Sequence, residues 1–189
     1  VNHVVERYHW VVVLVLNFFI LLTCSYAYRS LVAGFLLLIP VNLANEVLYA
    51  AMHLLDVGLD VNSLIVAAIG LGVGIDYGIY LLSRICEEYH QTGEWASAIT
   101  GALRTTGKAI LFTATIMGLG IAPWYFMSDL KFVADMGLLL IVIMAINMVL
   151  SLVVLPLLVW LVKPKFAERR DLLVGEGVDP RLFTEHPAT

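Results

Sequence analysis

The chain has 189 residues, of which 61% are hydrophobic and 14% are charged, and its mean hydropathy is +0.92. Soluble domains are usually about 45 to 50% apolar, so this composition excludes an ordinary soluble domain and indicates insertion in a lipid bilayer. The formal net charge of −4 says little about partners, because membrane contact is then made by insertion. We expect the lipid bilayer as a partner and no nucleic acid.

Five apolar segments are each long enough to cross about 30 Å of hydrocarbon as a helix of roughly 20 residues. In chain order they cover residues 8–28, 30–55, 63–82, 109–126 and 132–162. The last is over-long and is expected to tilt or to extend beyond the membrane. None alternates polar and apolar residues as membrane barrel strands do. The sequence therefore predicts an all-α fold, a polytopic membrane helical bundle with five transmembrane helices.

One further helix and a tail are predicted outside these segments. Apolar side chains recur at helical spacing from Trp95 to Leu103, which predicts a short amphipathic helix along the cytoplasmic membrane surface. Residues 164–189 mix charges with Gly and Pro and show no sustained period, so we expect a loose cytoplasmic tail. The predicted organisation is a helical bundle over residues 1–163 and a tail over 164–189.

Orientation follows from the basic residues, which favour the cytoplasmic side. The turn at Arg29, the segment 84–108 and the residues after 162 hold most of the Lys and Arg. The N-terminus is then expected in the periplasm and the C-terminus in the cytoplasm. Because the chain begins at Val1 without a recognisable signal peptide, we expect a piece of a longer protein, entered from an extracytoplasmic domain that follows another membrane helix.

The residue types that commonly hold metals are scattered along the chain. The five histidines have no ligand spacing, and the two cysteines, Cys24 and Cys86, lie in or just beyond separate apolar segments. No disulfide, metal or other cofactor is expected.

A carboxylate interrupts the third apolar segment, in the stretch GLGVGIDYGIYLL of residues 70–82. A charged Asp near mid-membrane costs about 3 kcal/mol on insertion scales, so Asp76 is expected to face protein or water and to have a function. The alternative is a neutral Asp that is hydrogen-bonded to a neighbouring helix. Gly70, Gly74 and Gly78 form a stripe of small residues that lets another helix approach closely.

Other polar residues lie at similar depths and are candidate relay positions or polar partners of Asp76. The candidates are Glu46, Thr113, Thr115 and Asn147, with Asn42 and Asn45 beside Glu46. Single Asn and Thr residues in membrane helices also serve as hydrogen bonds between helices. Glu46 is the other acid deep in a span, and it either shares a cavity with Asp76 or points outward.

The pattern around Asp76 argues against two familiar chemistries. Intramembrane aspartyl proteolysis needs two carboxylates that share a proton, one of them in a Gly-x-Gly-Asp sequence, and here Ile75 makes that spacing one residue too long. A dinucleotide fingerprint would need glycine at Tyr77 and a preceding strand. A carboxylate that binds and releases a proton, as a proton-driven transporter requires, is the simplest remaining role.

Three stretches resemble the C-terminal membrane half of RND superfamily exporters of the MMPL-like and hopanoid-exporter type. They are GLGVGIDYGIYLLSRICEEY, ASAITGALRTTGKAILFTATIMGLGIAP and MGLLLIVIMAINMVLSLVVLPLLVWL, and the resemblance runs from about residue 12 to residue 164. It implies helices eight to twelve of a twelve-helix transporter in a bacterial inner membrane. It also implies that Asp76 and Tyr77 match the Asp-Tyr pair that couples proton flow to transport in such proteins.

The resemblance also indicates what accompanies this chain. The first membrane half, both periplasmic domains and the seventh helix are the implied partners, and a periplasmic partner or a homo-oligomer stays open. We therefore expect part of a proton-driven exporter of hydrophobic or lipid-like substrates, and no enzyme. The alternative is a non-transporting scaffold or sterol-sensing-type membrane module, which proton-dependent flux by the full-length protein would distinguish.

Overall fold

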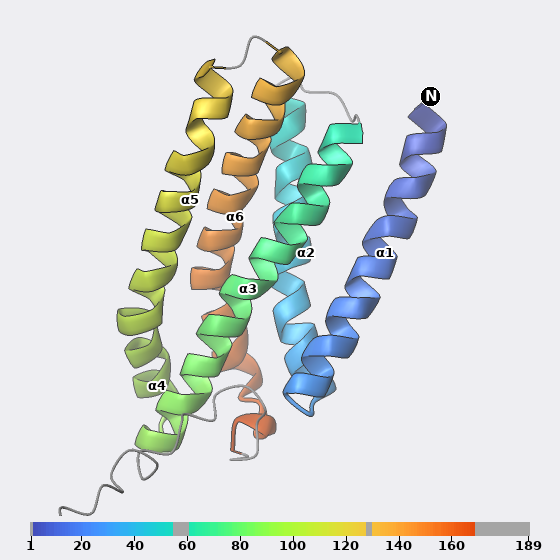
Figure 1. Ribbon diagram of the computed structural model, residues 1–189. Coiled ribbons are helices and arrows are strands. Elements are labelled where there is room, and N and C mark those ends of the chain that lie inside the picture. The colour runs from blue at the N-terminus through green and yellow to red at the C-terminus, as the bar shows by residue number, and fades with distance from the viewer. Residues whose placement is uncertain (1, 55–60, 128–129, 169–189) are drawn as a thin grey trace, which may run out of the picture.

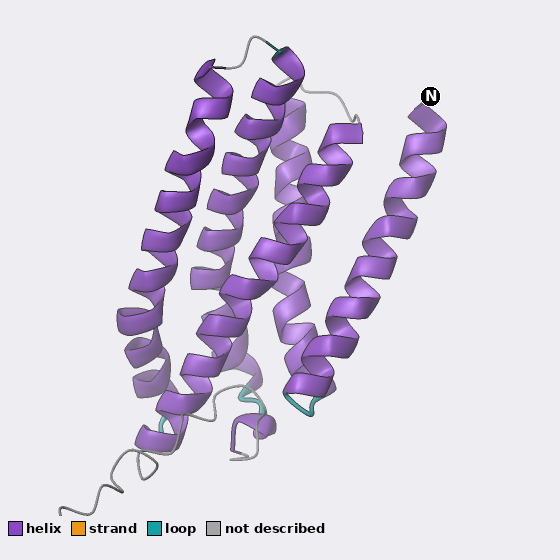
Figure 2. Ribbon diagram, viewed as in Figure 1, coloured by secondary structure: helices purple, strands orange, loops and turns teal. Residues whose placement is uncertain are grey.

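The computed structural model describes residues 2–54, 61–127 and 130–168, and within these ranges the chain is a bundle of helices without strands (Figures 1 and 2). The long helices are α1 (Asn2–Ala27), α2 (Leu31–Leu54), α3 (Val61–Thr92), α5 (Lys108–Met127) and α6 (Lys131–Val162). The predicted all-α fold is confirmed.

Four stretches of the described helices are long and apolar enough to cross a membrane. They are Leu31–Leu54, Ile65–Thr92, Trp95–Met127 and Val133–Val162, and α1 adds a shorter apolar stretch, Val11–Ala27. Together they support a multi-pass membrane protein.

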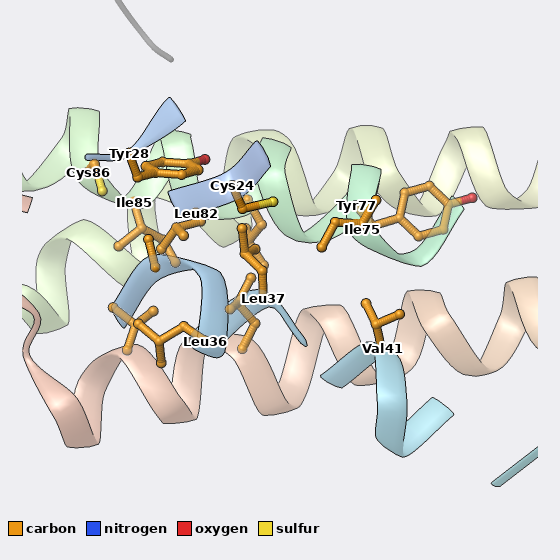
Figure 3. Packing of buried hydrophobic residues seen from close by; sticks show 14 of the residues in the cluster. Cys24, Tyr28, Leu36, Leu37, Val41, Ile75, Tyr77, Leu82, Ile85 and Cys86 are labelled. Carbon is orange, nitrogen blue, oxygen red and sulfur yellow. The ribbon is translucent and has the colours of Figure 1, made fainter. Parts of the chain in front are cut away.

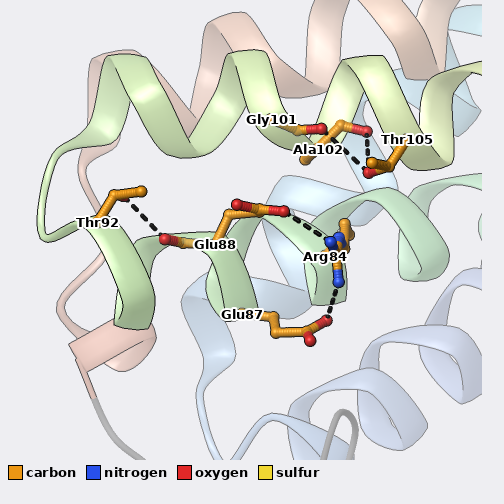
Figure 4. A network of polar contacts seen from close by, with 7 residues as sticks. All are labelled: Arg84, Glu87, Glu88, Thr92, Gly101, Ala102 and Thr105. Carbon is orange, nitrogen blue, oxygen red and sulfur yellow. Dashed lines mark hydrogen bonds and ion pairs between the residues drawn. The ribbon is translucent and has the colours of Figure 1, made fainter.

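The third helix is longer than the apolar pattern predicts, because α3 continues beyond Leu82 to Thr92. Arg84 forms ion pairs of 2.7 Å with both Glu87 and Glu88, three and four residues further along the same helix (Figure 4). Such pairs stabilise a helix that carries charge. The helix ends at Gly93, whose φ of +68° is favourable only for a residue without a side chain.

The predicted amphipathic helix is present as α4 (Trp95–Ala102), which continues without a break in the helical backbone into the next segment. A π-helical segment, η1 (Leu103–Gly107), joins it to α5, so the two form one helix beside α3 (Figure 1). Tyr89 stacks on Trp95 with ring centroids 4.1 Å apart, and this contact closes the turn between α3 and α4. The predicted helix is thus confirmed over Trp95–Ala102, and its place along the membrane surface stays a prediction.

Helix α6 packs against α2, α3 and α5, whereas α1 lies at the edge of the bundle beside α2 (Figure 1). The glycine stripe of α3 faces these neighbours. A Cβ atom at Gly70 would collide with Ile143 of α6, one at Gly74 with Asn147 of α6, and one at Gly78 would lie 2.9 Å from Leu37 of α2.

A buried hydrogen bond joins α3 to α6 at the same level. Asn147 is 1% exposed, and its Nδ2 donates to the carbonyl oxygen of Gly70 at 2.8 Å. The side chain therefore has a fixed place against Gly70 and Gly74.

The segment after α6 folds back against the bundle. In η2 (Lys165–Glu168), Phe166 is buried and its ring centroid lies 5.9 Å from that of Tyr28. The Tyr28 hydroxyl in turn lies 2.7 Å from Ser83 Oγ and donates to the Ile79 carbonyl at 3.2 Å. The expected loose tail is therefore packed at its beginning, while residues 169–189 lie outside the described residues.

These contacts predict that Gly74→Ala lowers the free energy of unfolding by about 1 to 3 kcal/mol, the usual cost of overpacking. The added methyl group must displace Asn147 from its hydrogen bond with Gly70. The control is Gly118→Ala, because a Cβ at Gly118 of α5 meets nothing within 4 Å and alanine favours a helix. Melting temperatures of the full-length protein in detergent test this, and equal effects of the two variants would contradict it.

Candidate proton-relay site

Asp76 lies on the face of α3 that points away from α6. Gly72, Asp76 and Tyr80, spaced at intervals of four residues, are all exposed, and a Cβ atom at Gly72 would meet nothing within 4 Å. Gly74 and Gly78, on the other side of the same turns, are buried against α6 and α2. Within the described residues the Asp76 carboxylate forms no hydrogen bond or ion pair. It is thus presented on an open side of this bundle.

Tyr77 points elsewhere, because consecutive residues on a helix project about 100° from each other, as 3.6 residues per turn requires. It is 4% exposed and belongs to the buried cluster that also contains Cys24, Leu37 and Leu82 (Figure 3). Its hydroxyl donates to the sulfur of Met117 on α5 at 3.8 Å. Tyr77 therefore lies at the contact between α3 and α5, next to the face that carries Asp76.

A groove of about 550 Å³ runs between α3 and the helix formed by η1 and α5. Its lining on α3 is Tyr77, Tyr80, Ser83, Arg84 and Glu87, and on the opposite side Thr106, Ala109, Ile110 and Thr113. The groove extends from the charged end of α3 to Tyr77, and Tyr80 in its lining lies a single helical turn from Asp76. Hydroxyl groups therefore line both walls of the groove: those of Tyr77, Tyr80 and Ser83 on α3, and those of Thr106 and Thr113 on the opposite side.

Five polar lining residues, Tyr80, Ser83, Arg84, Glu87 and Thr106, are not among the candidates predicted from the sequence. For the residues at positions 80, 84 and 87 a signal exists in the sequence of α3. Together with position 77 they lie at intervals of three and four residues, so they share one face of the helix. No comparable signal shows which face of the following helix lies opposite.

The charged end of the groove carries an ion-pair network (Figure 4). Arg84 donates from Nη1 to Glu87 and from Nη2 to Glu88, both at 2.7 Å. Its Nε is buried and has no partner among the described residues. Of this network, Arg84 and Glu87 line the groove, whereas Glu88 does not.

The two candidate threonines, Thr113 and Thr115, form the same kind of hydrogen bond but lie on different sides of α5. Thr113 Oγ1 donates to the Ala109 carbonyl at 2.9 Å, and Thr115 Oγ1 donates to the Leu111 carbonyl at 2.8 Å. Thr113 lines the groove and Thr115 does not. Thr113 is therefore the one that the fold brings to the groove.

The other polar candidates lie outside the groove. Asn147 is bonded to Gly70 between α3 and α6, and Asn42 exchanges amide hydrogen bonds of 2.9 and 3.0 Å with Asn17 of α1. Asn45 is buried, and its amide has no partner among the described residues. Glu46 is exposed on α2 and does not share the groove with Tyr77.

In the described part of the chain, no group of three or more His, Cys, Asp or Glu side chains could hold a metal ion. Cys24 and Cys86 are both buried free thiols. The polar chemistry of the described bundle is therefore that of carboxylates, hydroxyls and amides.

Comparison with known proteins places these features in a family. The profile of the MMPL family matches residues 3–181. The chain is 32% identical to protein MJ1562 of Methanocaldococcus jannaschii over 133 residues, which are 68% of this chain and 34% of that protein. It is 31% identical to the heme uptake protein MmpL11 of Mycobacterium tuberculosis over 139 residues, 73% of this chain and 14% of the relative.

A third relative is the trehalose monomycolate exporter MmpL3 of Mycobacterium tuberculosis, 30% identical over 97 residues, which are 49% of this chain and 10% of MmpL3. No solved structure matches. The chain thus spans about a third or less of the length of these relatives. The matched region contains α1 to α6 with Asp76 and Tyr77, and the resemblance noted in the sequence is confirmed: the chain belongs to the MMPL family.

Proposed function

We propose that this chain is the proton-coupling region of an RND-type MMPL exporter and that Asp76 carries the proton. The observation that carries the proposal is the position of Asp76, within a membrane-length helix, on an exposed face, and one helical turn from Tyr80, which lines a groove with several hydroxyl groups. A carboxylate that faced lipid would cost about 3 kcal/mol, so this face must be covered by protein or reached by water.

The rest of the full-length protein is the proposed cover. The chain spans only a fraction of the length of its relatives, so a second membrane half is available to pack against Gly72, Asp76 and Tyr80. Gly72 leaves room for a close approach at this point. In that arrangement Asp76 faces an interior between two halves.

The groove supplies the proposed route for protons. A proton enters beside Glu87, passes along waters held by Ser83, Thr106, Tyr80 and Thr113, and reaches Asp76. Protonation removes the charge, and a neutral carboxyl is far less costly to enclose between packed helices than a carboxylate. Enclosure and exposure of Asp76 can therefore alternate with its protonation, and this alternation drives transport.

Orientation and substrate complete the proposal. The turn after α1, the end of α3, η1 and the end of α6 lie at one end of the bundle and carry Arg29, Arg84, Arg104 and Lys163 (Figure 1). By the positive-inside rule, the proposed orientation has that end in the cytoplasm, and the proposed location is a bacterial inner membrane. MmpL3 is named as an exporter, which supports the proposed export of hydrophobic or lipid-like molecules. MmpL11 is named as an uptake protein, so substrate flux should be measured in both directions.

The direct prediction concerns Asp76→Asn, which keeps the shape of the side chain but cannot titrate. We expect it to abolish substrate flux driven by a pH gradient in vesicles that contain the full-length protein, without loss of insertion. Glu46→Gln is the matched control, because Glu46 is exposed on α2 away from the groove. Tyr77→Phe, which removes one hydroxyl and no charge, should reduce flux only partly.

Wild-type flux from Asp76→Asn would remove Asp76 from the mechanism. No flux by the wild-type protein would favour the non-transporting alternative, and flux that is independent of the pH gradient would contradict proton coupling. Inactive Glu46→Gln at normal protein levels would mean that the relay contains a second acid.

The threonine pair gives a further prediction. Thr113→Val and Thr115→Val each remove a hydroxyl that bonds to a carbonyl on its own helix, so their effects on folding should match. Only Thr113 lines the groove. Loss of one hydrogen bond of about 1 kcal/mol along the route should slow proton-coupled flux about three- to tenfold in Thr113→Val. A Thr115→Val variant that slows equally would contradict the proposed route.

A further inference from the structure

A second pocket, of about 370 Å³, lies at the same end of the bundle and shares no lining residue with the groove beside Tyr77. It is formed where α1 turns into α2 and where α6 passes into η2. Arg29, Lys163 and Lys165 line it, together with Ser30, and no acidic side chain lines it among the residues that the structure describes. Three cations from two distant segments of the chain thus converge on one hollow.

The backbone at this pocket is unusual. Arg29 has a φ of 48° and Lys163 a φ of 42°, and they are the non-glycine residues with positive φ in the described chain. Arg29 follows α1 in a Schellman arrangement, with Ser30 N–H donating to the Ser25 carbonyl at 3.1 Å and Arg29 N–H to the Tyr26 carbonyl at 3.2 Å. Glycine is the usual residue there, and a side chain in the left-handed region costs about 1 kcal/mol or more. Both left-handed positions carry a cation that lines the pocket.

The three cations have no counter-charge within the described residues. None of them forms an ion pair or a side-chain hydrogen bond there, whereas Arg84 at the same end of the bundle forms two ion pairs. Like charges that share one hollow repel each other, so the pocket favours an anion. Helix α2 begins at Leu31, and the unpaired N–H groups of its first turn add to the positive potential beside Ser30.

The pocket also opens onto an apolar surface. Val32 of α2 and Val162 of α6 line it and are 44% and 47% exposed. Exposed apolar side chains continue along both helices, with Phe35 on α2 and Leu161 on α6. In a membrane-spanning bundle, this surface contacts acyl chains. The cations lie at its end, where the phosphate groups of lipids are found.

We propose that this pocket binds the phosphate of an anionic phospholipid, with Arg29, Lys163 and Lys165 as its ligands and the acyl chains along Val32 and Val162. A guanidinium can bind two phosphate oxygens at once, and the ammonium groups act as point charges. Basic pockets between helices at the cytoplasmic surface suit such head groups. The proposal does not depend on the role of Asp76.

The test uses native mass spectrometry of the full-length protein mixed with phosphatidylglycerol or with phosphatidylcholine of the same acyl chains. The wild-type protein should retain more phosphatidylglycerol than phosphatidylcholine. The double variant Arg29→Gln/Lys163→Gln should weaken that retention about thirtyfold, since each cation near a lipid surface contributes to affinity. Glutamine keeps the backbone strain unchanged, because it also carries a Cβ atom.

The matched control is Arg104→Gln/Lys108→Gln, which removes the same two charge types from the same end of the bundle but outside the pocket. It should retain the preference. Equal losses in both double variants would overturn the proposal in favour of general charge attraction. Displacement of phosphatidylglycerol by millimolar inorganic phosphate would overturn the lipid assignment in favour of a soluble phosphate. If the double variant does not fold, Lys165→Gln in η2 replaces it, and an unchanged preference there would also contradict the proposal.

Discussion

The contact between α3 and α6 determines the directions in which the functional side chains of α3 point. Lipid tails are as apolar as helix surfaces, so helices in a membrane associate through close packing and hydrogen bonds. Here Gly70 and Gly74 admit Ile143 and Asn147, and Asn147 bonds to the Gly70 carbonyl. Together these contacts fix the rotation of α3 about its axis. With that rotation fixed, Asp76 has to point away from α6, and Tyr77 has to point toward α5.

Similar charges at one end of the bundle have different roles because their surroundings differ. Arg84 is paired with Glu87 and Glu88, so its charge is balanced and the entrance of the groove stays polar without attracting a permanent anion. Arg29 and Lys163 line a pocket in which the described part of the chain places no acidic side chain. Tyr28 and Phe166 pack between the two regions and keep η2 in place. The proposed proton route and the proposed lipid site are therefore separate features at one end of the bundle.

The sequence predicts much of this arrangement where the signal is local. Glycine spacing and a lone carboxylate suffice to place Gly74 and Asp76 on different faces of one helix. The end of α3 is missed because the apolar run stops at Leu82, whereas ion pairs from Arg84 continue the helix. The helical spacing of apolar residues predicts the amphipathic face of α4, but it does not predict how α4 is joined to α5. The groove and the partner of Asn147 depend on how separate helices are rotated against each other, which no single segment encodes.

The central claim is that Asp76 changes its protonation while the protein works. Infrared difference spectroscopy of the full-length protein in lipid measures this most directly, through the C=O stretch of a protonated carboxylic acid as the pH is changed. If Asp76 carries the proton, a pH-dependent band is expected that is absent when residue 76 is asparagine and unchanged when residue 46 is glutamine. A band that persists without the Asp76 carboxyl would contradict the claim.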